Sequence, residues 1–336
     1  MRSTVRKHIA RRFALVLAVV GCAAVATVPA WQSAATYTEV AEWPLPATTA
    51  AGTPSAWNFG QVVAVATGAD GNILVLHRGA QPILVFESDG TFVRGWGEGL
   101  FSNGKVMGVS PEDRAPGASG YTAVYGPAGC HACGAHGIRV DPEGHVWVVD
   151  APGHAVYKLR ETGELLMHLG TPGVSGAGHD TLNLPTDIAF APNGDIYVSD
   201  GYGNARIVRF SGEGRYLGEW GSRGTGPGEF GLPHGIAVAG DGRVYAVDRD
   251  NRRVQVFDAE GTFLDQWAEL TGVQALFVTQ GQRIWAGGAL RTLDGEILAE
   301  LTGGGGGHGM TVSHAGGVFA AQLSGRVQKF VAGSSD

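Results

Sequence analysis

The sequence predicts an all-β fold, a six-bladed β-propeller. Three observations predict it: a hairpin pattern recurs along the chain, its copies are spaced roughly 40 to 50 residues apart, and glycine is abundant, with 55 Gly among 336 residues. Hydrophobic residues make up 44% and charged residues 16%, which is ample material for a core and argues against disorder. A net charge of −7 argues against nucleic-acid binding.

The first 30 residues predict an export signal. Basic residues precede an uncharged apolar run at 13–28, and this run is shorter than the ~20 residues of a membrane span. Val19-Val20-Gly21-Cys22 resembles a bacterial lipobox, in which Cys22 would be lipidated and become the first mature residue. Cleavage after Ala30 is the alternative. We therefore expect export to the periplasm or the extracellular space, with membrane contact only through a lipid anchor.

Residues 35–332 are expected to form the propeller. Segments 136–150, 186–200 and 234–248 align with one another, and each is typical of a strand, a glycine turn and a second strand. A third and a fourth strand follow in the same order. The first strands begin near Val63, His136, Thr186, His234, Gln274 and His308, which gives six units.

The last unit supplies only three strands, the third of which ends at Phe330. Segment 37–43 has the aromatic and Glu-Trp pattern of the fourth strands. We therefore expect it to complete that unit, close the ring and remove the free sheet edges. Segment 98–129, between the first and second units, is rich in Gly and Pro and predicts a surface loop, so it is a candidate rim for substrate binding.

Three histidines occupy the same position of the repeat. His136, His234 and His308 each begin the innermost strand of a unit, and these units alternate with units that carry other residues there. Because alternate blades of a six-bladed ring are about 120° apart, three such imidazoles would converge on the axis. Three histidines with an open fourth position are the protein half of a catalytic zinc site. Any one of them alone would more simply be a structural residue, but their common phase predicts a zinc centre.

Several segments together resemble a known family. They are Leu184-Pro-Thr-Asp-Ile-Ala189, Asp200-Gly-Tyr-Gly-Asn204 and His77-Arg-Gly79, read beside the three histidines. The chain resembles the peptidyl-α-hydroxyglycine α-amidating lyases, which are six-bladed propellers of NHL type, over about residues 58–330. The resemblance implies a zinc-dependent carbon–nitrogen lyase, a peptidylamidoglycolate lyase, that cleaves a peptidyl-α-hydroxyglycine to a peptide amide and glyoxylate.

The resemblance also implies roles for individual residues. The zinc ligands would be the three histidines, and Tyr202 would be the base that takes the proton of the α-hydroxyl group. Arg78 would be the catalytic cation near the substrate carboxylate, with Arg249 as a second candidate. A free tyrosine has a pKa of ~10, so a nearby cation would be needed to stabilise the phenolate.

The resemblance also implies a structural calcium site, but one of its expected ligands is absent from this sequence. The family's calcium site uses two backbone carbonyls, which would fall on Val65 and Ile138, and an Asp directly after the third histidine. Gly309 stands at that Asp position. Since Ca²⁺ depends on carboxylate oxygens, we expect its binding to be weak.

Two further cysteines lie just before the first histidine. Cys130 and Cys133 form a Cys-x-x-Cys pair, which in an exported protein is most often a small-loop disulfide. A second soft metal site with His131 is the alternative.

Two other functions stay open at the level of sequence. One is a non-catalytic NHL propeller that binds a protein, a peptide or a glycan, and the other is a different metal-dependent propeller enzyme such as a lactonase. For the lyase we expect a monomer and a small peptide or N-acylglycine-derived substrate. A separate monooxygenase would generate that substrate.

Overall fold

The computed structural model describes residues 35–48, 54–102, 134–303 and 305–333. The predicted export signal with Cys22, most of the 98–129 insertion, and the Cys130 and Cys133 pair lie outside the described residues and stay predictions. In the part of the chain that is described, no helix has the length and hydropathy of a transmembrane span.

The described residues form an all-β propeller, as the sequence predicts. Four sheets contain four strands each: β4 (Val62–Thr67), β5 (Ile73–His77), β6 (Ile83–Phe86) and β7 (Phe92–Trp96); β8 (Gly137–Val140), β9 (Val146–Asp150), β10 (Ala155–Leu159) and β11 (Leu165–Leu169); β12 (Asp187–Phe190), β13 (Ile196–Asp200), β14 (Arg206–Phe210) and β15 (Tyr216–Trp220); and β18 (Pro233–Val238), β19 (Val244–Asp248), β20 (Arg253–Phe257) and β21 (Phe263–Trp267).

The remaining strands form one large sheet and two small ones. The large sheet has eight strands in the order β22 (Leu276–Val278), β23 (Ile284–Ala286), β24 (Ala289–Arg291), β25 (Ile297–Leu301), β1 (Ala35–Glu39), β28 (Arg326–Ala332), β27 (Val318–Gln322) and β26 (Gly309–Val312). The small sheets pair β2 (Ala47–Thr48) with β3 (Pro54–Ser55) and β16 (Ser222–Arg223) with β17 (Glu229–Phe230).

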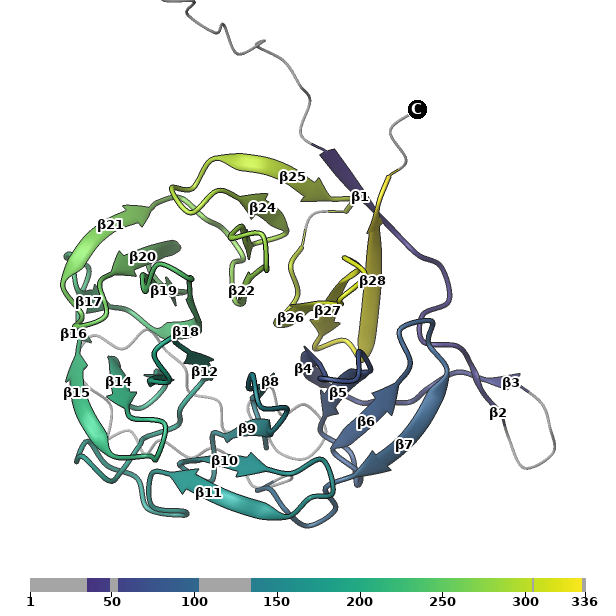
Figure 1. Ribbon diagram of the computed structural model, residues 1–336, viewed down its shortest axis with the longest axis horizontal. Helices are drawn as coiled ribbons and strands as arrows, with labels where there is room; N and C mark the ends of the chain where they lie inside the picture. The colour runs from purple at the N-terminus through teal and green to yellow at the C-terminus, as the bar shows by residue number, and fades with distance from the viewer. Residues whose placement is uncertain (1–34, 49–53, 103–133, 304, 334–336) are drawn as a thin grey trace, which may run out of the picture. The chain divides into compact units, whose positions relative to one another are not determined.

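The innermost strands enclose a common axis. Strands β4, β8, β12, β18, β22 and β26 contact one another in that order, and β26 contacts β4 (Figure 1). Every residue of the second strands β9, β13 and β19 is buried, because each lies between neighbouring strands and is covered on both faces. The outer strand β15 alternates between exposed and half-buried residues, as expected of a strand with one face in solvent.

A tight turn joins the first two strands of each unit, and its turn residue is glycine in five of the six units. The residue eight positions after the predicted first-strand start, as Gly144 is after His136, has a positive φ in all six hairpins: Gly71, Gly144, Gly194, Gly242, Gln282 and Gly316. Glycine adopts this conformation without steric cost, so the recurring glycines indicate the turn positions in the sequence. Gln282 departs from the pattern, and its unit is the one with the shortest strands.

The N-terminal strand differs from its predicted bounds. Strand β1 pairs antiparallel with β28 and parallel with β25, but it ends at Glu39, earlier than the predicted segment 37–43. Glu42 has a φ of 61°, which breaks the extended conformation. Trp43 is buried and packs against Phe319, with ring centroids 4.8 Å apart. The strand is therefore shorter than predicted at its C-terminal end, because the chain leaves the extended conformation at Glu42.

Candidate metal centre at the propeller axis

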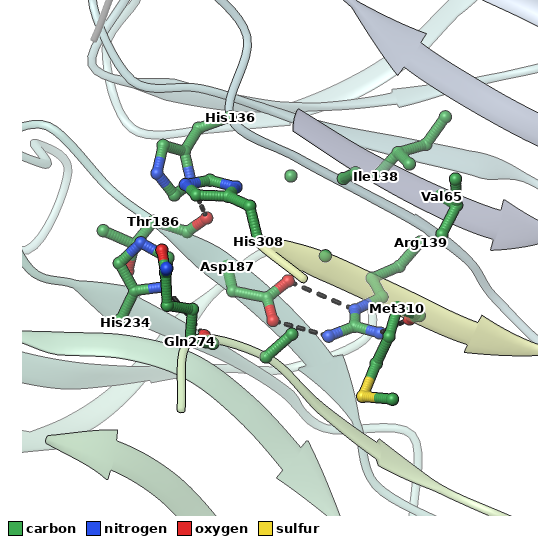
Figure 2. Close-up of a pocket in the computed structure, with 14 residues that line it drawn as sticks. Val65, His136, Ile138, Arg139, Thr186, Asp187, His234, Gln274, His308 and Met310 are labelled. Carbon is green, nitrogen blue, oxygen red and sulfur yellow. Dashed lines mark hydrogen bonds and ion pairs between the residues drawn. The ribbon is translucent and has the colours of Figure 1, made fainter. Parts of the chain in front are cut away.

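The three histidines of the repeat lie together at the axis. His136 precedes β8, His234 lies in β18 and His308 precedes β26, and their exposed fractions are 3%, 2% and 7%. The three ring centroids are 4.6, 4.9 and 5.0 Å apart, and one nitrogen atom from each ring lies within 4.8 Å of the others. Figure 2 shows the rings gathered at one end of a small axial pocket. Three buried histidines in this arrangement could hold a metal ion.

Each histidine is oriented by the next unit of the ring. The Nδ1 atoms lie next to backbone carbonyl oxygens in three pairs: His136 with Thr186 at 2.7 Å, His234 with Gln274 at 2.8 Å, and His308 with Val63 at 2.7 Å. Because a carbonyl oxygen only accepts hydrogen bonds, each Nδ1 must carry the hydrogen. Nε2 therefore carries the lone pair that can bind a metal, as in many zinc sites with an oriented second ring nitrogen.

A glycine follows each of these histidines and makes that contact possible. A Cβ atom at Gly137, Gly235 or Gly309 would lie 3.1, 2.6 or 2.9 Å from the same carbonyl oxygen that accepts the Nδ1 hydrogen bond. Distances below about 3.0 Å would force the strands apart. The His-Gly pair is thus a unit in which glycine allows the close approach and histidine uses it.

The environment keeps the imidazoles neutral. Burial lowers the pKa of His308 to about 4. Burial also lowers the pKa of His136 and His234 well below its usual value. Repulsion between protonated neighbours adds to the effect, from His308 at the first and from His136 at the second, as does the charge of Arg249. Imidazole binds metals in its neutral form. At neutral pH, metal binding to this cluster therefore does not require removal of a proton from Nε2.

Tyr202 lies directly against the cluster. Its hydroxyl oxygen is 3.0 Å from Nε2 of His136 and 3.5 Å from Nε2 of His234. The residue follows β13, the second strand of its unit. Since the end of a second strand lies beside the start of the first strand in an antiparallel hairpin, loops after second strands surround the same mouth of the axis as the histidines.

The two candidate arginines follow second strands as well. Arg78 comes directly after β5 and Arg249 directly after β19. Burial lowers the pKa of Arg78 to about 10, and an electrostatic interaction with Tyr202 opposes this shift. Arg249 donates from Nη1 to the Tyr202 hydroxyl at 3.4 Å and holds its guanidinium carbon 5.5 Å from the ring centroid. It also pairs with Asp250 at 3.3 Å. The structure thus brings both arginines to the tyrosine and the histidines.

The residues implied for calcium do not fit that ion. Val65, Ile138 and Gly309 do line the axial pocket below the histidines. However, a side chain at Gly309 would place its Cβ 2.6 Å from the Cα of Ala64, so the carboxylate of an Asp has no room there. The pocket also contains the guanidinium group of Arg139, which is already a cation.

One other group of possible ligands has a structural explanation. Asp141, Glu143 and His145 lie close enough to share an ion. The carboxylate of Asp141 accepts hydrogen bonds from Trp147 Nε1 at 2.9 Å and from the backbone of His145 at 2.8 Å, and it also pairs with a lysine of β10. These contacts account for the cluster as a turn of the β8–β9 hairpin.

A polar pair and three carbonyl groups at the axis were not predicted from the sequence. Arg139 takes the position where the aligned repeats have Ala189 and Ala237, and Asp187 takes the position of Gly137 and Gly235. The two departures carry opposite charges and lie two positions apart in the repeat, but each occurs in one unit only, so the alignment alone does not pair them. The repeated His-Gly dipeptide, by contrast, was a visible sign of the carbonyl contacts.

Fold and cluster together define the class of protein: an all-β propeller with a buried axial cluster of three histidines that could hold a metal ion. A family model described as "6-bladed beta-propeller" matches residues 184–280. Among solved structures, the chain is similar to the virginiamycin B lyase of Staphylococcus aureus, with a TM-score of 0.53, 15% identity, and coverage of 82% of this chain and 96% of that one. That likeness concerns the fold alone.

Curated proteins give a more specific relation. The chain is 32% identical over 207 residues to "Probable peptidyl-alpha-hydroxyglycine alpha-amidating lyase pgal-1" of Caenorhabditis elegans, covering 60% of this chain and 56% of that protein. It is 32% identical over 212 residues to the peptidylglycine alpha-amidating monooxygenase of Rattus norvegicus, covering 60% of this chain and 21% of that protein. It is also 32% identical over 194 residues to NHL repeat-containing protein 3 of Homo sapiens, covering 55% of this chain and 48% of that protein.

The resemblance seen in the sequence is therefore confirmed: the chain is related to the peptidyl-α-hydroxyglycine α-amidating lyases and to NHL repeat proteins. It spans 56% and 21% of the length of the first two relatives, so the relation concerns part of each of them.

Proposed function

We propose that this protein is a zinc-dependent lyase that cleaves peptidyl-α-hydroxyglycines to a peptide amide and glyoxylate. One arrangement supports it above all: three buried imidazoles lie together at the axis, with a tyrosine hydroxyl 3.0 Å from one of them and two arginines whose charges act on the tyrosine and the histidines. The proposal includes six blades, with the eight-stranded sheet counted as two blades joined by β1.

The donor set suits zinc. Three imidazole nitrogens with one position left for water or substrate are typical of catalytic zinc, whereas Ca²⁺ and Mg²⁺ prefer oxygen ligands. His136, His234 and His308 would hold the ion. When bound, zinc supplies Lewis-acid polarisation of a substrate oxygen and electrostatic stabilisation of a nearby anion.

The chain's own residues account for the proton transfer. The Tyr202 oxygen, as phenolate, takes the proton from the α-hydroxyl group of the substrate, and the cationic Arg249 beside it stabilises that phenolate. The carbon–oxygen double bond of glyoxylate forms while the bond between carbon and the amide nitrogen breaks. The proton then passes from Tyr202 to that nitrogen, so the products are a neutral peptide amide and glyoxylate, and the tyrosine returns to its starting state.

Arg78 is suited to hold the substrate carboxylate. Its guanidinium group is half-buried, it donates a hydrogen bond to Gln61, and its charge acts on both Tyr202 and His136. It also lines a pocket of about 330 Å³ together with Gly79, Pro82 and Phe101. An arginine can bind a carboxylate through two parallel hydrogen bonds, which would fix the α-carbon near the tyrosine.

The first test combines metal content with activity. We expect about one zinc ion per chain in the purified protein, and its loss in His234→Ala. The metal-bearing protein should release glyoxylate from a synthetic N-acyl-α-hydroxyglycine. Absence of zinc, or retention of zinc in His234→Ala, would contradict the metal centre. Zinc bound without any glyoxylate release would contradict the lyase reaction alone.

A non-catalytic propeller is the second candidate, and the relation to NHL repeat-containing protein 3 favours it. In that case the same mouth of the axis would bind a protein, a peptide or a glycan without chemical change. Retention of a hydroxyglycine peptide with no turnover would support this candidate over the lyase.

The proposal extends to the cellular context. We propose that the chain is exported, either anchored through a lipid on Cys22 or released after Ala30, and that a separate monooxygenase supplies its small peptide substrate. Replacement of Cys22 by Ala should abolish membrane association if the anchor exists.

We further propose that the chain is a monomer and that Cys130 and Cys133 form a disulfide. Mass measurement before and after reduction would test the disulfide.

A further inference from the structure

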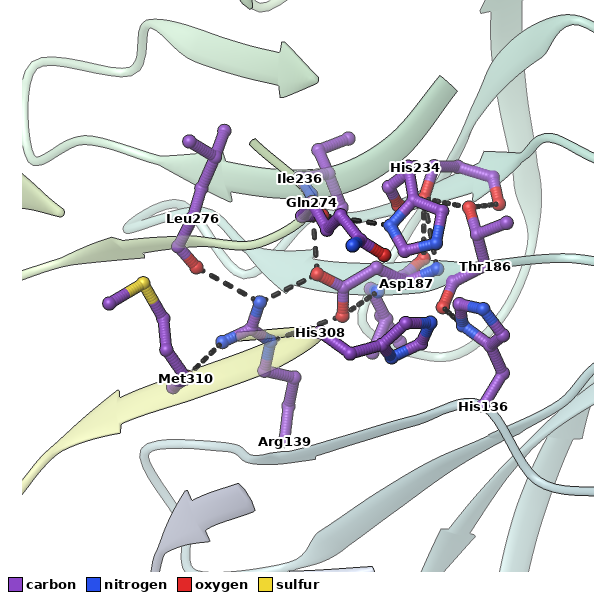
Figure 3. Close-up of polar contacts among 12 residues, drawn as sticks. His136, Arg139, Thr186, Asp187, His234, Ile236, Gln274, Leu276, His308 and Met310 are labelled. Atoms are coloured by element: carbon purple, nitrogen blue, oxygen red, sulfur yellow. Dashed lines mark hydrogen bonds and ion pairs between the residues drawn. The ribbon is translucent and has the colours of Figure 1, made fainter. Parts of the chain in front are cut away.

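The axis below the histidines is occupied by an ion pair between two units of the ring. Arg139 of β8 donates from Nε to Asp187 at 3.1 Å and from Nη2 to the other carboxylate oxygen at 2.6 Å. The two side chains are only 15% and 12% exposed. Figure 3 shows this bidentate pair beside the histidine cluster.

The guanidinium group also contacts backbone carbonyl oxygens of two further units. Nη2 donates to the carbonyl oxygen of Leu276 at 3.0 Å, and Nη1 lies 3.4 Å from that of Met310. These oxygens and the Asp187 carboxylate form a cradle of negative and partly negative groups around one positive charge. Oxygen atoms of this kind are the ligands that a hard cation such as Ca²⁺ prefers.

Asp187 is fixed in the cradle from its other side. Its two oxygens accept hydrogen bonds from the backbone amides of Ile188 at 2.9 Å and Ile236 at 3.2 Å. The ion pair therefore connects the inner strands β8, β12, β18, β22 and β26. Because the carboxylate keeps its amide partners when the guanidinium is removed, it would stay as a positioned anion.

The same guanidinium separates two cavities along the axis. Arg139 lines the small pocket that contains the three histidines, about 20 Å³ in volume. It also lines a cavity of about 460 Å³ on the opposite side, together with residues such as Thr67, Thr311 and Trp285. Arg139 thus lies between the histidine cluster and the larger cavity.

We propose that Arg139 is a built-in cation that takes the place of a structural calcium ion at the propeller axis. Its guanidinium neutralises Asp187, bridges the inner strands and forms the base of the histidine site. Arg139 and Asp187, the two departures from the repeat, supply the opposite charges of this arrangement. At Gly309 the backbone of Ala64 leaves no space for a carboxylate on β26. This proposal is independent of the lyase reaction, since it concerns only which cation occupies the axis.

The test measures calcium binding and thermal stability. After dialysis against calcium, the wild-type protein should retain no stoichiometric calcium by elemental analysis, and its Tm should be the same in Ca²⁺ and in EGTA. Arg139→Ala leaves a buried carboxylate without its cation, so its Tm in EGTA should fall by roughly 5 to 15 °C. Calcium, or methylguanidinium, should restore part of this loss, because either can enter the vacated cradle.

Matched variants separate this role from an ordinary ion pair. Arg160→Ala removes an exposed arginine, 55% accessible, that pairs with Glu164, so its Tm should change little and should not respond to calcium. The double variant Arg139→Met/Asp187→Leu removes both charges and should be more stable in EGTA than Arg139→Met.

Three results would overturn the proposal. One is a stoichiometric calcium ion in the wild-type protein. Another is a Tm of Arg139→Ala that neither calcium nor methylguanidinium raises. The third is a double variant no more stable than Arg139→Met, which would remain decisive if Arg139→Ala does not fold.

Discussion

The Nδ1 atom of His308 lies 2.7 Å from the carbonyl oxygen of Val63, a contact between residues 245 positions apart in the sequence. It joins the innermost strands of the last and the first units, β26 and β4. The orientation of a candidate metal ligand therefore depends on the meeting of the two ends of the ring. Since His136 and His234 make the same contact with the units that follow them, the metal centre is a property of unit packing and not of any single hairpin.

The glycine after each histidine should therefore control metal affinity without being a ligand. In Gly235→Ala, the added methyl group would lie 2.6 Å from the carbonyl oxygen of Gln274 and would push it away from His234. Loss of such a partner typically weakens metal binding about 10- to 100-fold. Competition with a chromophoric chelator would measure the affinity. Gly218→Ala is the control, because a Cβ there meets nothing within 4 Å. Equal affinities of the two variants would refute the role of the contact.

Much of the fold could be predicted because its signals are local and repeated. The turn glycines Gly144, Gly194 and Gly242 share a positive φ, and each is followed by a buried strand that begins with β-branched and aromatic residues and ends in Asp. Each copy carries the same information, so an irregular unit such as that of Gln282 can be recognised by its neighbours. The phase of the three histidines followed from the same alignment.

The axial ion pair could not be predicted in this way, because each partner breaks the repeat only once. Arg139 is a charged residue in an inner strand, and Asp187 is an acid in a position that otherwise favours glycine. Their contact joins residues 48 positions apart, and its carbonyl partners belong to still other units. The repeat pattern describes only what the units share. Arg139 and Asp187 come together only when the units close into a ring.

Tyr202→Phe should separate catalysis from metal binding. The hydroxyl group is 3.0 Å from a ligand nitrogen but is not needed to hold the three imidazoles, which are fixed through Nδ1. We expect glyoxylate release to fall about 10²- to 10⁴-fold, the usual contribution of a general base, while zinc content is unchanged. Tyr216→Phe, at a half-buried ring of β15 that stacks on His179, is the matched control. Full activity of Tyr202→Phe would remove the tyrosine from the mechanism.

The metal-free protein should lose stability as the pH falls from about 6.5 to about 4. Burial lowers the pKa of His308 in the folded state to about 4, while the unfolded chain has the usual value near 6.5. Below the pKa of the unfolded state, the unfolded chain binds more protons than the native protein. The free energy of unfolding therefore decreases as the pH falls. For this one residue the loss amounts to about 3 kcal/mol.

The comparison that checks this pH dependence uses a variant of the same position. Gln274 occupies the equivalent position of another unit, so glutamine is compatible with the local backbone in His308→Gln. Without the imidazole, the decrease of Tm between about pH 6.5 and about pH 4 should be smaller than in the metal-free wild type. If Tm falls equally with pH in the two proteins, burial does not lower the pKa of His308.

The two arginines should have different kinetic effects if they have the proposed roles. Arg78→Gln removes the charge expected to bind the substrate carboxylate, so KM should rise roughly 10- to 100-fold, the range of a charge-assisted hydrogen bond. Arg249→Gln removes the cation 3.4 Å from the Tyr202 hydroxyl, so kcat should fall and its pH dependence should shift towards higher pH, since the phenolate is then less stabilised. A substrate with an amide in place of its carboxylate should lose the effect of Arg78→Gln but keep that of Arg249→Gln. If both variants change KM alone and to the same extent, neither arginine acts through the tyrosine.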